Sequence, residues 1–223
     1  MDEGFDNNVV DDSGSQLHGS KTRNTSKTVP GKFSHALKFD GISFETVRIE
    51  NNPVFHFGTQ SFSFTAWIKI NDYTYPRTSL AVKQGNGCYF RPTRPGFTAG
   101  WDIGHGHQTD RTQICIRDHL SNVGRTYIKH DANFPHTVLR GKWVHYGVVF
   151  DRRAGKVFLY LNGQRQKNFA DIEHVTGSID NKLPLEFGTL YGWKTDGSID
   201  EYRLYNIALS DYAMQLIYND HRV

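Results

Sequence analysis

The sequence lacks two features that would restrict its function at once: a long apolar run and a strong excess of one charge. No stretch approaches the roughly 18 consecutive apolar residues of a membrane span. Lysine and arginine number 26 against 23 aspartates and glutamates, which gives a formal charge of only +3. Nucleic-acid-binding proteins usually carry a larger and clustered basic excess. We therefore expect neither membrane insertion nor a nucleic-acid partner.

Cysteine is also scarce. The two cysteines, Cys88 and Cys115, lie in no CxxC or Cys/His spacing of the kind that binds metal. In the segment 112–117, alternation places Cys115 with the polar residues, opposite Ile114 and Ile116. One disulfide and two free thiols both fit this pattern.

Helical periodicity is found in one place, near the end of the chain. The segment 210–218 can begin with Ser210 as its N-terminal cap. Its apolar residues fall on one helical face: Leu209, Ala213, Leu216 and Ile217. We expect one short C-terminal helix.

Aromatic residues, at 13%, and glycine, with 21 residues, are plentiful, which favours β-strands joined by tight turns. The segments 61–69, 142–150 and 156–163 read as strands, and the last ends in an Asn-Gly pair suited to a hairpin turn. Consecutive hairpins favour an antiparallel sandwich over a βαβ arrangement. The length of 223 residues suits a single domain spanning 1–223.

Several segments, in order along the chain, form a set of motifs: 11–14 with 18–19, 36–41 with 47–49, 64–69, 141–145 with 159–163, and 197–210. They correspond to the patterns D-x-S-G with H-G, A-L-x-F-D-G with V-x-I, F-T-x-x-A-W-V-K, G-x-W-H-H with L-Y-V-N-G, and G-x-I-D-E-V-R-I-Y-N-R-A-L-S. In these motifs the chain resembles the laminin-G-like, concanavalin-A-like lectin/glucanase domains. The match is weakest across 84–140.

The resemblance implies an all-β fold, a two-sheet antiparallel jelly-roll sandwich whose first and last segments lie side by side. Bulky strand residues fill the space of about 10 Å between two such sheets. We therefore expect an inner-face core formed by Trp67, Trp143, Phe150, Phe158 and Leu204.

The resemblance also implies a structural calcium ion near the chain termini, held by the Asp of F-D-G and the Asp of I-D-E. Those positions are Asp40 and Asp200 in this chain. Hard cations such as Ca²⁺ take carboxylate and carbonyl oxygens. The alternative is that Asp40 turns the chain before Gly41 and that Asp200 pairs with an arginine of a neighbouring strand.

Enzymes of this fold carry motifs that are absent here. No E-x-D-x-x-E strand occurs, and the neighbours Asp200 and Glu201 should point to opposite faces of a strand. The segments 111–117 and 125–130 contain the residue types of a polysaccharide lyase but not its sequence patterns. A G-x-S-x-G nucleophile motif is also missing. We expect a non-catalytic protein, with a polysaccharide lyase or hydrolase as the less favoured alternative.

Candidate ligand-binding residues gather in 84–140, which holds five of the 11 histidines and many arginines. Arginine and histidine donors suit acidic sugars, and tryptophan faces stack on pyranose rings. Trp101 and Trp193 lie in turn-like settings, where core packing and a ligand platform are equally compatible. The pair His105 and His107 could also suggest zinc, although an exposed polar loop explains it better. We predict a binding site formed by Arg91, Trp101, His105, His107, Arg117 and Trp193.

Taken together, these patterns predict a non-catalytic, extracellular or cell-surface binding module of a larger secreted protein. The start of the chain, 1–5, shows no secretion signal, which fits either a cytosolic protein or such an excised module. The favoured partner is a glycan or polysaccharide, with an acidic one suited to the arginines. The alternative is an extracellular protein bound by an adhesion module of the same fold.

Overall fold

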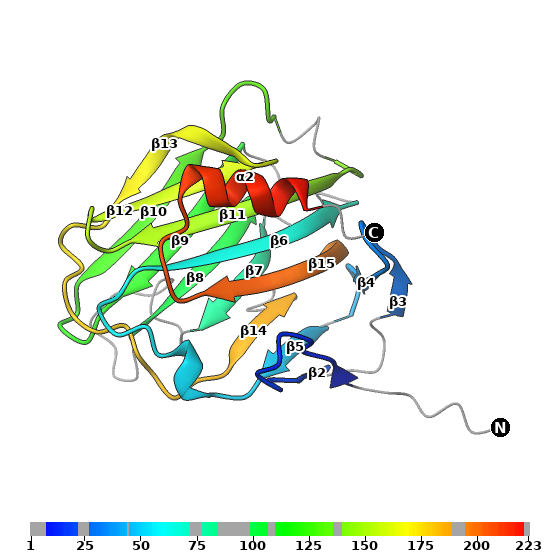
Figure 1. The fold of residues 1–223 in the computed structure, drawn as a ribbon, viewed down its shortest axis with the longest axis horizontal. Coiled ribbons are helices and arrows are strands. Elements are labelled where there is room, and N and C mark those ends of the chain that lie inside the picture. The colour runs from blue at the N-terminus through cyan, green and yellow to red at the C-terminus, as the bar shows by residue number, and fades with distance from the viewer. Residues whose placement is uncertain are drawn as a thin grey trace.

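The computed structural model describes residues 8–21, 27–43, 45–71, 77–83, 99–106, 110–135, 140–188 and 195–220. The chain forms two antiparallel sheets packed face to face, with a short helix, α2, lying across the outside of one of them (Figure 1). The predicted all-β jelly-roll sandwich with a C-terminal helix is therefore confirmed. Among the residues that the structure describes, no helix has the length and apolar character of a membrane span.

One sheet has eight strands in the order β1-β2-β5-β14-β7-β8-β9-β10. Their bounds are β1 (Asn8–Val9), β2 (Gly19–Lys21), β5 (Thr46–Ile49), β14 (Leu185–Gly188), β7 (Arg77–Lys83), β8 (Gly100–Gly106), β9 (Arg111–Arg117) and β10 (Val123–Lys129). The other sheet has seven strands in the order β13-β12-β11-β6-β15-β4-β3. Their bounds are β13 (Gln164–Asp171), β12 (Lys156–Leu161), β11 (Trp143–Asp151), β6 (Phe62–Ile70), β15 (Asp196–Tyr205), β4 (His35–Asp40) and β3 (Lys27–Pro30). A 3-10 turn, η1 (Pro53–Phe55), and the helix α2 (Asp211–Asn219) complete the elements.

The last strand of the chain, β15, lies between β6 and β4, so the beginning and end of the chain meet in one sheet. The predicted hairpin between 142–150 and 156–163 is the β11–β12 pair. These local patterns are reliable because hairpin strands are neighbours in sequence and share one turn.

The main core lies between the sheets. On β6 the even-numbered side chains, Phe62 to Ile70, point inward, and on β11 the inward residues include Val148 and Phe150. Phe62 stacks on Phe150, with ring centres 4.3 Å apart. Alternation along each strand thus gives one apolar inner face.

The predicted inner-face set is correct only in part. Phe150 belongs to the main core and Leu204 packs against it. Trp67 and Trp143 occupy the odd-numbered, outer side of the seven-stranded sheet, where Trp67 is aligned with His145 and Trp143 with Lys69 in the pairing of β6 and β11. Their bulk made them resemble core residues, but the phase of the strands places them outside the sandwich.

Phe158 also lies outside the main core, in a second apolar cluster beneath α2. This cluster is formed by Val149, Tyr160, Leu209 and Met214, with Phe158 packed against it. A Cβ atom at Gly147 would lie 2.4 Å from the Met214 sulfur, so the glycine allows the helix to approach the sheet closely. Ser210 caps α2 as predicted, accepting a hydrogen bond from the Ala213 amide at 3.2 Å.

Candidate functional site

Three of the six predicted ligand-binding residues lie outside the described residues: Arg91, His107 and Trp193. Cys88 does as well, whereas Cys115 is disulfide-bonded and fully buried. The structure therefore places Trp101, His105 and Arg117 and says nothing of the other three.

Trp101 is a core residue. Its side chain is 1% exposed, and its ring centre lies 5.1 Å from that of Phe62 and 6.3 Å from those of Phe57 and Phe150. A ring enclosed in this way presents no face to a sugar. Of the two interpretations that the sequence leaves open for Trp101, core packing is the correct one.

His105 also points between the sheets, because it has the same strand phase as Trp101. Its Nδ1 atom lies 2.8 Å from the Tyr146 hydroxyl, and its ring stacks on His130 at 5.7 Å. The Thr112 hydroxyl lies 2.9 Å from Nε2 of His130, which completes a buried polar cluster. His105 was predicted to bind a ligand at the surface, but it is an interior residue. Its polar neighbours supply the hydrogen-bond partners that a buried polar group requires.

Arg117, in contrast, belongs to the outer face of the eight-stranded sheet. On β9, Thr112, Ile114 and Ile116 point inward, so the alternate residues point outward. The pairing with β10 aligns these outward residues: Arg111 faces Lys129, Gln113 faces Tyr127, Cys115 faces Arg125 and Arg117 faces Val123. Gln113, Cys115 and Arg117 are buried, whereas the β10 partners are more accessible.

Four of these outward side chains are exposed: Arg111, Arg125, Tyr127 and Lys129. We call them the basic strip. Tyr127 is 48% exposed and lies between Arg125 and Lys129 on β10, which are about 13 Å apart along the strand. Like charges directly opposite each other, as at Arg111 and Lys129, destabilise a sheet, so an anion placed between them would be stabilising.

A buried carboxylate holds the turn that joins the two strands of the basic strip. Asp118 accepts hydrogen bonds from the backbone amide and the side-chain amide of Asn122, both at 2.9 Å, and from the Gly177 amide at 2.8 Å. Burial acts to raise the pKa of Asp118, but these hydrogen bonds outweigh it and the pKa is lowered. The β9–β10 hairpin is therefore anchored at its closed end, which holds the strip in a fixed geometry.

The basic strip lies within the segment 84–140 that the sequence predicts to bind ligand, but its four residues are not among the predicted ones, of which only Arg117 is a neighbour. Arg125 and Lys129 lie in the basic segment 84–140, but sequence alone does not show which strand residues face solvent. The alternation of inward and outward residues in 123–129, with Ile128 pointing inward, is the sequence signal that could have identified the exposed residues.

The two carboxylates predicted to hold calcium lie on neighbouring strands but not at one place. Asp40 is aligned with Asp196 across the β4–β15 pairing, and Asp200 is farther along β15, about 13 Å away. Asp40 forms the local turn that the sequence offered as the alternative to a metal ligand. It accepts hydrogen bonds from the amides of Ile42 at 2.8 Å and Ser43 at 2.7 Å.

Asp200 ties the turn between β3 and β4 to β15. It accepts hydrogen bonds from the amides of Lys32 at 2.8 Å, Phe33 at 3.0 Å and Glu201 at 2.8 Å. Burial raises the pKa of Asp200 despite these bonds. Asp40 and Asp200 therefore do not fit one shared Ca²⁺ ion, and the described residues contain no group of three or more His, Cys, Asp or Glu suited to a metal. Calcium binding stays a prediction from the resemblance.

The expectation that Asp200 and Glu201 point to opposite faces is wrong. A β-bulge interrupts the pairing of β15 with β6 between Asp200 and Arg203, and Glu201 has a φ of +50°. Ile199 and Tyr202 both pack with the main core, so the two residues between them lie away from it. A bulge adds one residue to a strand and shifts its phase in this way.

The sequence profile of the concanavalin A-like lectin/glucanases superfamily matches residues 43–213. A search of curated proteins by sequence gives no match.

Among solved structures, the chain is similar to three toxin binding domains. The binding domain of Paraclostridial Mosquitocidal Protein 1 has a TM-score of 0.71 and 16% identity over 97% of this chain and 53% of that one. The botulinum neurotoxin serotype D ligand binding domain in complex with N-acetylneuraminic acid has a TM-score of 0.66 and 16% identity, over 95% of this chain and 48% of that one. The botulinum neurotoxin DC binding domain in complex with rat synaptotagmin II has a TM-score of 0.67 and 14% identity, over 97% of this chain and 51% of that one.

This chain thus spans about half the length of each of these domains, and the likeness to them is one of fold. Because the profile match covers most of the sequence and agrees with the observed sandwich, the chain belongs to the concanavalin A-like lectin/glucanases superfamily.

Proposed function

We propose that this protein is a non-catalytic, extracellular carbohydrate-binding module that recognises an acidic glycan along the basic strip of β9 and β10. The observation that carries the proposal is the row of exposed Arg111, Arg125 and Lys129 around the half-exposed Tyr127. Membership of a lectin-containing superfamily supports a sugar ligand. One structural neighbour was solved with N-acetylneuraminic acid, a sugar that carries a carboxylate.

The chemistry of the strip suits a carboxylated or sulfated chain. A guanidinium group binds such anions through two parallel hydrogen bonds, and a lysine adds a point charge. The Tyr127 ring offers an apolar face for a pyranose between the two charges of β10. Of the outward residues on β9 and β10, four are basic, including the buried Arg117, and none is acidic.

Binding to heparin-like sulfated polysaccharide and to its desulfated counterpart, measured by isothermal titration calorimetry, tests the proposal. The double variant Arg125→Ala/Lys129→Ala should lower the affinity for the sulfated chain about tenfold. The exposed pair Arg153→Ala/Lys142→Ala removes the same charge elsewhere and should leave the affinity unchanged. Affinity should also fall as NaCl rises, because the screening length is about 10 Å at 0.1 M salt.

Equal loss in both double variants would show a non-specific charge effect and contradict a site on the strip. Equal affinity for sulfated and desulfated chains would contradict the acidic ligand. Release of reducing ends or unsaturated products from the polysaccharide would overturn the non-catalytic assignment.

A protein-binding adhesion module is the second candidate. The specific observation is on α2, where Tyr212 is 70% and Leu216 53% exposed and the two lie one turn apart on the same side of the helix. A pair of exposed apolar side chains of this kind is typical of contact surfaces for proteins. Loss of partner binding in Tyr212→Ala/Leu216→Ala, with glycan binding unaffected, would favour this function.

A further inference from the structure

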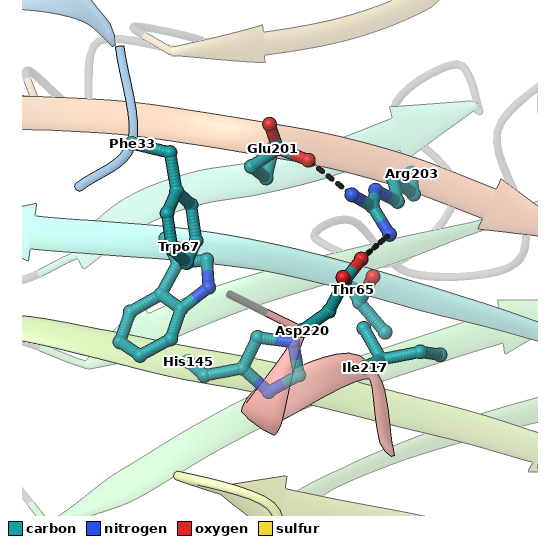
Figure 2. A pocket seen from close by; sticks show the side chains of 8 residues that line it. All are labelled: Phe33, Thr65, Trp67, His145, Glu201, Arg203, Ile217 and Asp220. Carbon is teal, nitrogen blue, oxygen red and sulfur yellow. Dashed lines mark hydrogen bonds and ion pairs between the residues drawn. The ribbon is translucent and has the colours of Figure 1, made fainter. Parts of the chain in front are cut away.

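A small pocket lies on the outer face of the seven-stranded sheet, on the side of the sandwich opposite the basic strip. Figure 2 shows it between β6, β11 and β15, with Phe33 at one side and the end of α2 at the other. Its volume is about 10 Å³, which is room for about one water-sized group. A single hydroxyl of a larger molecule would therefore enter it, whereas a sugar ring would stay outside. The lining residues are Phe33, Thr65, Trp67, His145, Glu201, Arg203, Ile217 and Asp220.

The inner part of this pocket contains two buried polar atoms that have no hydrogen-bond partner among the described residues. They are Oγ1 of Thr65, a residue with 0% exposure, and Nδ1 of His145, a residue with 1% exposure. Buried polar atoms in native proteins are nearly always paired, so an unpaired couple lining one pocket indicates a missing partner. The pKa of His145 is lowered to about 4, mainly by burial and to a lesser degree by the positive charge of Arg203. The imidazole is therefore neutral at neutral pH, and its Nδ1 can either donate or accept a hydrogen bond, depending on the tautomer.

The rim of the pocket offers both donors and acceptors. Arg203 donates to the Glu201 carboxylate, and its other terminal nitrogen lies 3.9 Å from a carboxylate oxygen of Asp220 (Figure 2). The bulge in β15 brings Glu201 onto this face, and its φ of +50° is a strained conformation for a residue other than glycine. Bulges often redirect a side chain next to a binding site.

The charges of the lining residues exclude one ligand class. Arg203 supplies one positive charge against two carboxylates, Glu201 and Asp220, and neutral His145 adds none. The Lys32 ammonium, 4.6 Å from the Trp67 ring, balances the second carboxylate, so a sulfated or carboxylated group would meet no net positive charge here, in contrast to the basic strip. Neighbouring hydroxyl groups suit this combination of hydrogen-bond donors and acceptors, since each hydroxyl donates one hydrogen bond and accepts others.

We propose that this pocket binds one hydroxyl of the terminal residue of a neutral glycan, and that this hydroxyl enters between Thr65 and His145. Neighbouring hydroxyls then contact Arg203 and the carboxylates of Glu201 and Asp220 at the rim. This site is separate from the basic strip and does not depend on the function proposed for it. The module thereby has two recognition surfaces of opposite chemistry on its two outer faces.

Saturation-transfer NMR with methyl hexosides of glucose, galactose and mannose, at ~10 mM each and with the full chain, tests the site. At least one hexoside should receive saturation. Thr65→Val keeps the side-chain shape and removes only the unpaired hydroxyl, so it should fold normally and lower the affinity about tenfold. Ser79→Ala removes another buried hydroxyl without a partner among the described residues, but in the other sheet, and is the matched control that should bind as the wild type does.

Asp220→Asn provides a second variant, because the Asp220 side chain is 46% exposed and its replacement should not disturb folding. It should also weaken hexoside binding. Arg125→Ala/Lys129→Ala should leave hexoside binding unchanged, which separates this site from the basic strip. If no hexoside receives saturation, or if Thr65→Val and Asp220→Asn both bind as the wild type does, the pocket holds only water and the proposal is wrong.

Discussion

Acidification should destabilise the folded protein through His145, the buried imidazole of the pocket beneath α2. Burial, and to a lesser degree the nearby charge of Arg203, lowers its pKa from the ordinary value of 6.5 to about 4. Above pH 6.5 the imidazole is neutral in both the folded and the unfolded chain and stability is unaffected. As the pH falls from 6.5 to 4, only the unfolded chain binds the proton, so the free energy of unfolding falls through this window.

The magnitude follows from the same values. Lowering the pKa from 6.5 to about 4 corresponds to about 3 kcal/mol once the pH is below 4. Between pH 7 and pH 4.5 the expected loss is about 2.5 kcal/mol. The groups that surround the imidazole are the Trp67 ring at 5.4 Å, the Tyr218 ring at 6.0 Å, and the charged Glu201, Arg203 and Asp220 of the same pocket.

Urea unfolding at pH 7 and pH 4.5, followed by tryptophan fluorescence, measures this loss. Other groups also titrate in this range, so the informative quantity is the difference between the wild type and His145→Phe. That variant keeps an aromatic ring against Trp67 and removes the titration, and it should retain about 2.5 kcal/mol more of its neutral-pH stability at pH 4.5. The exposed His119→Phe is the control and should follow the wild type. If His145→Phe loses as much stability as the wild type does, the imidazole is not the acid-sensitive group and the reasoning is refuted.

Two further predictions concern residues that the sequence assigned to function. Trp101→Ala should lower the free energy of unfolding by about 3–5 kcal/mol, because it empties a core site; a variant with wild-type stability in urea would show that the ring is not core. Asp200→Ala leaves the amides of Lys32 and Phe33 without their acceptor and should lower stability by about 1–3 kcal/mol. The loss caused by Asp200→Ala should be the same in calcium and in chelator, since Asp40 and Asp200 do not share one ion; a loss seen only in calcium would contradict the geometry described for them.

The sequence determined those parts of the structure that depend on neighbouring residues. The β11–β12 hairpin, the Ser210 cap of α2 and the turn at Asp40 each require only a few consecutive residues, and all three occur where the local pattern indicates. The family motifs added the sandwich and the meeting of β4 with β15, which no local pattern contains.

The helix shows where local patterning reaches its limit. Leu216 belongs to the predicted apolar face of the helix and is 53% exposed, whereas Met214, outside that face, is fully buried. A helical wheel fixes which residues share a face, but contact with the sheet at Gly147 decides which face is covered.

The candidate sites depended on the tertiary structure for the same reason. Alternation predicts two faces for a strand, yet it does not say which face meets the other sheet, and so Trp67 was placed inside and Trp101 was offered as a ligand platform. The bulge in β15 shifted the phase of Glu201, which local alternation could not reveal. The sequence by itself determined that the chain forms a lectin-like sandwich, because strand and turn patterns indicate antiparallel hairpins and the family motifs supply the topology. Only the packing of the two sheets and α2 decided which polar side chains reach solvent, because burial is set by residues far apart in the chain.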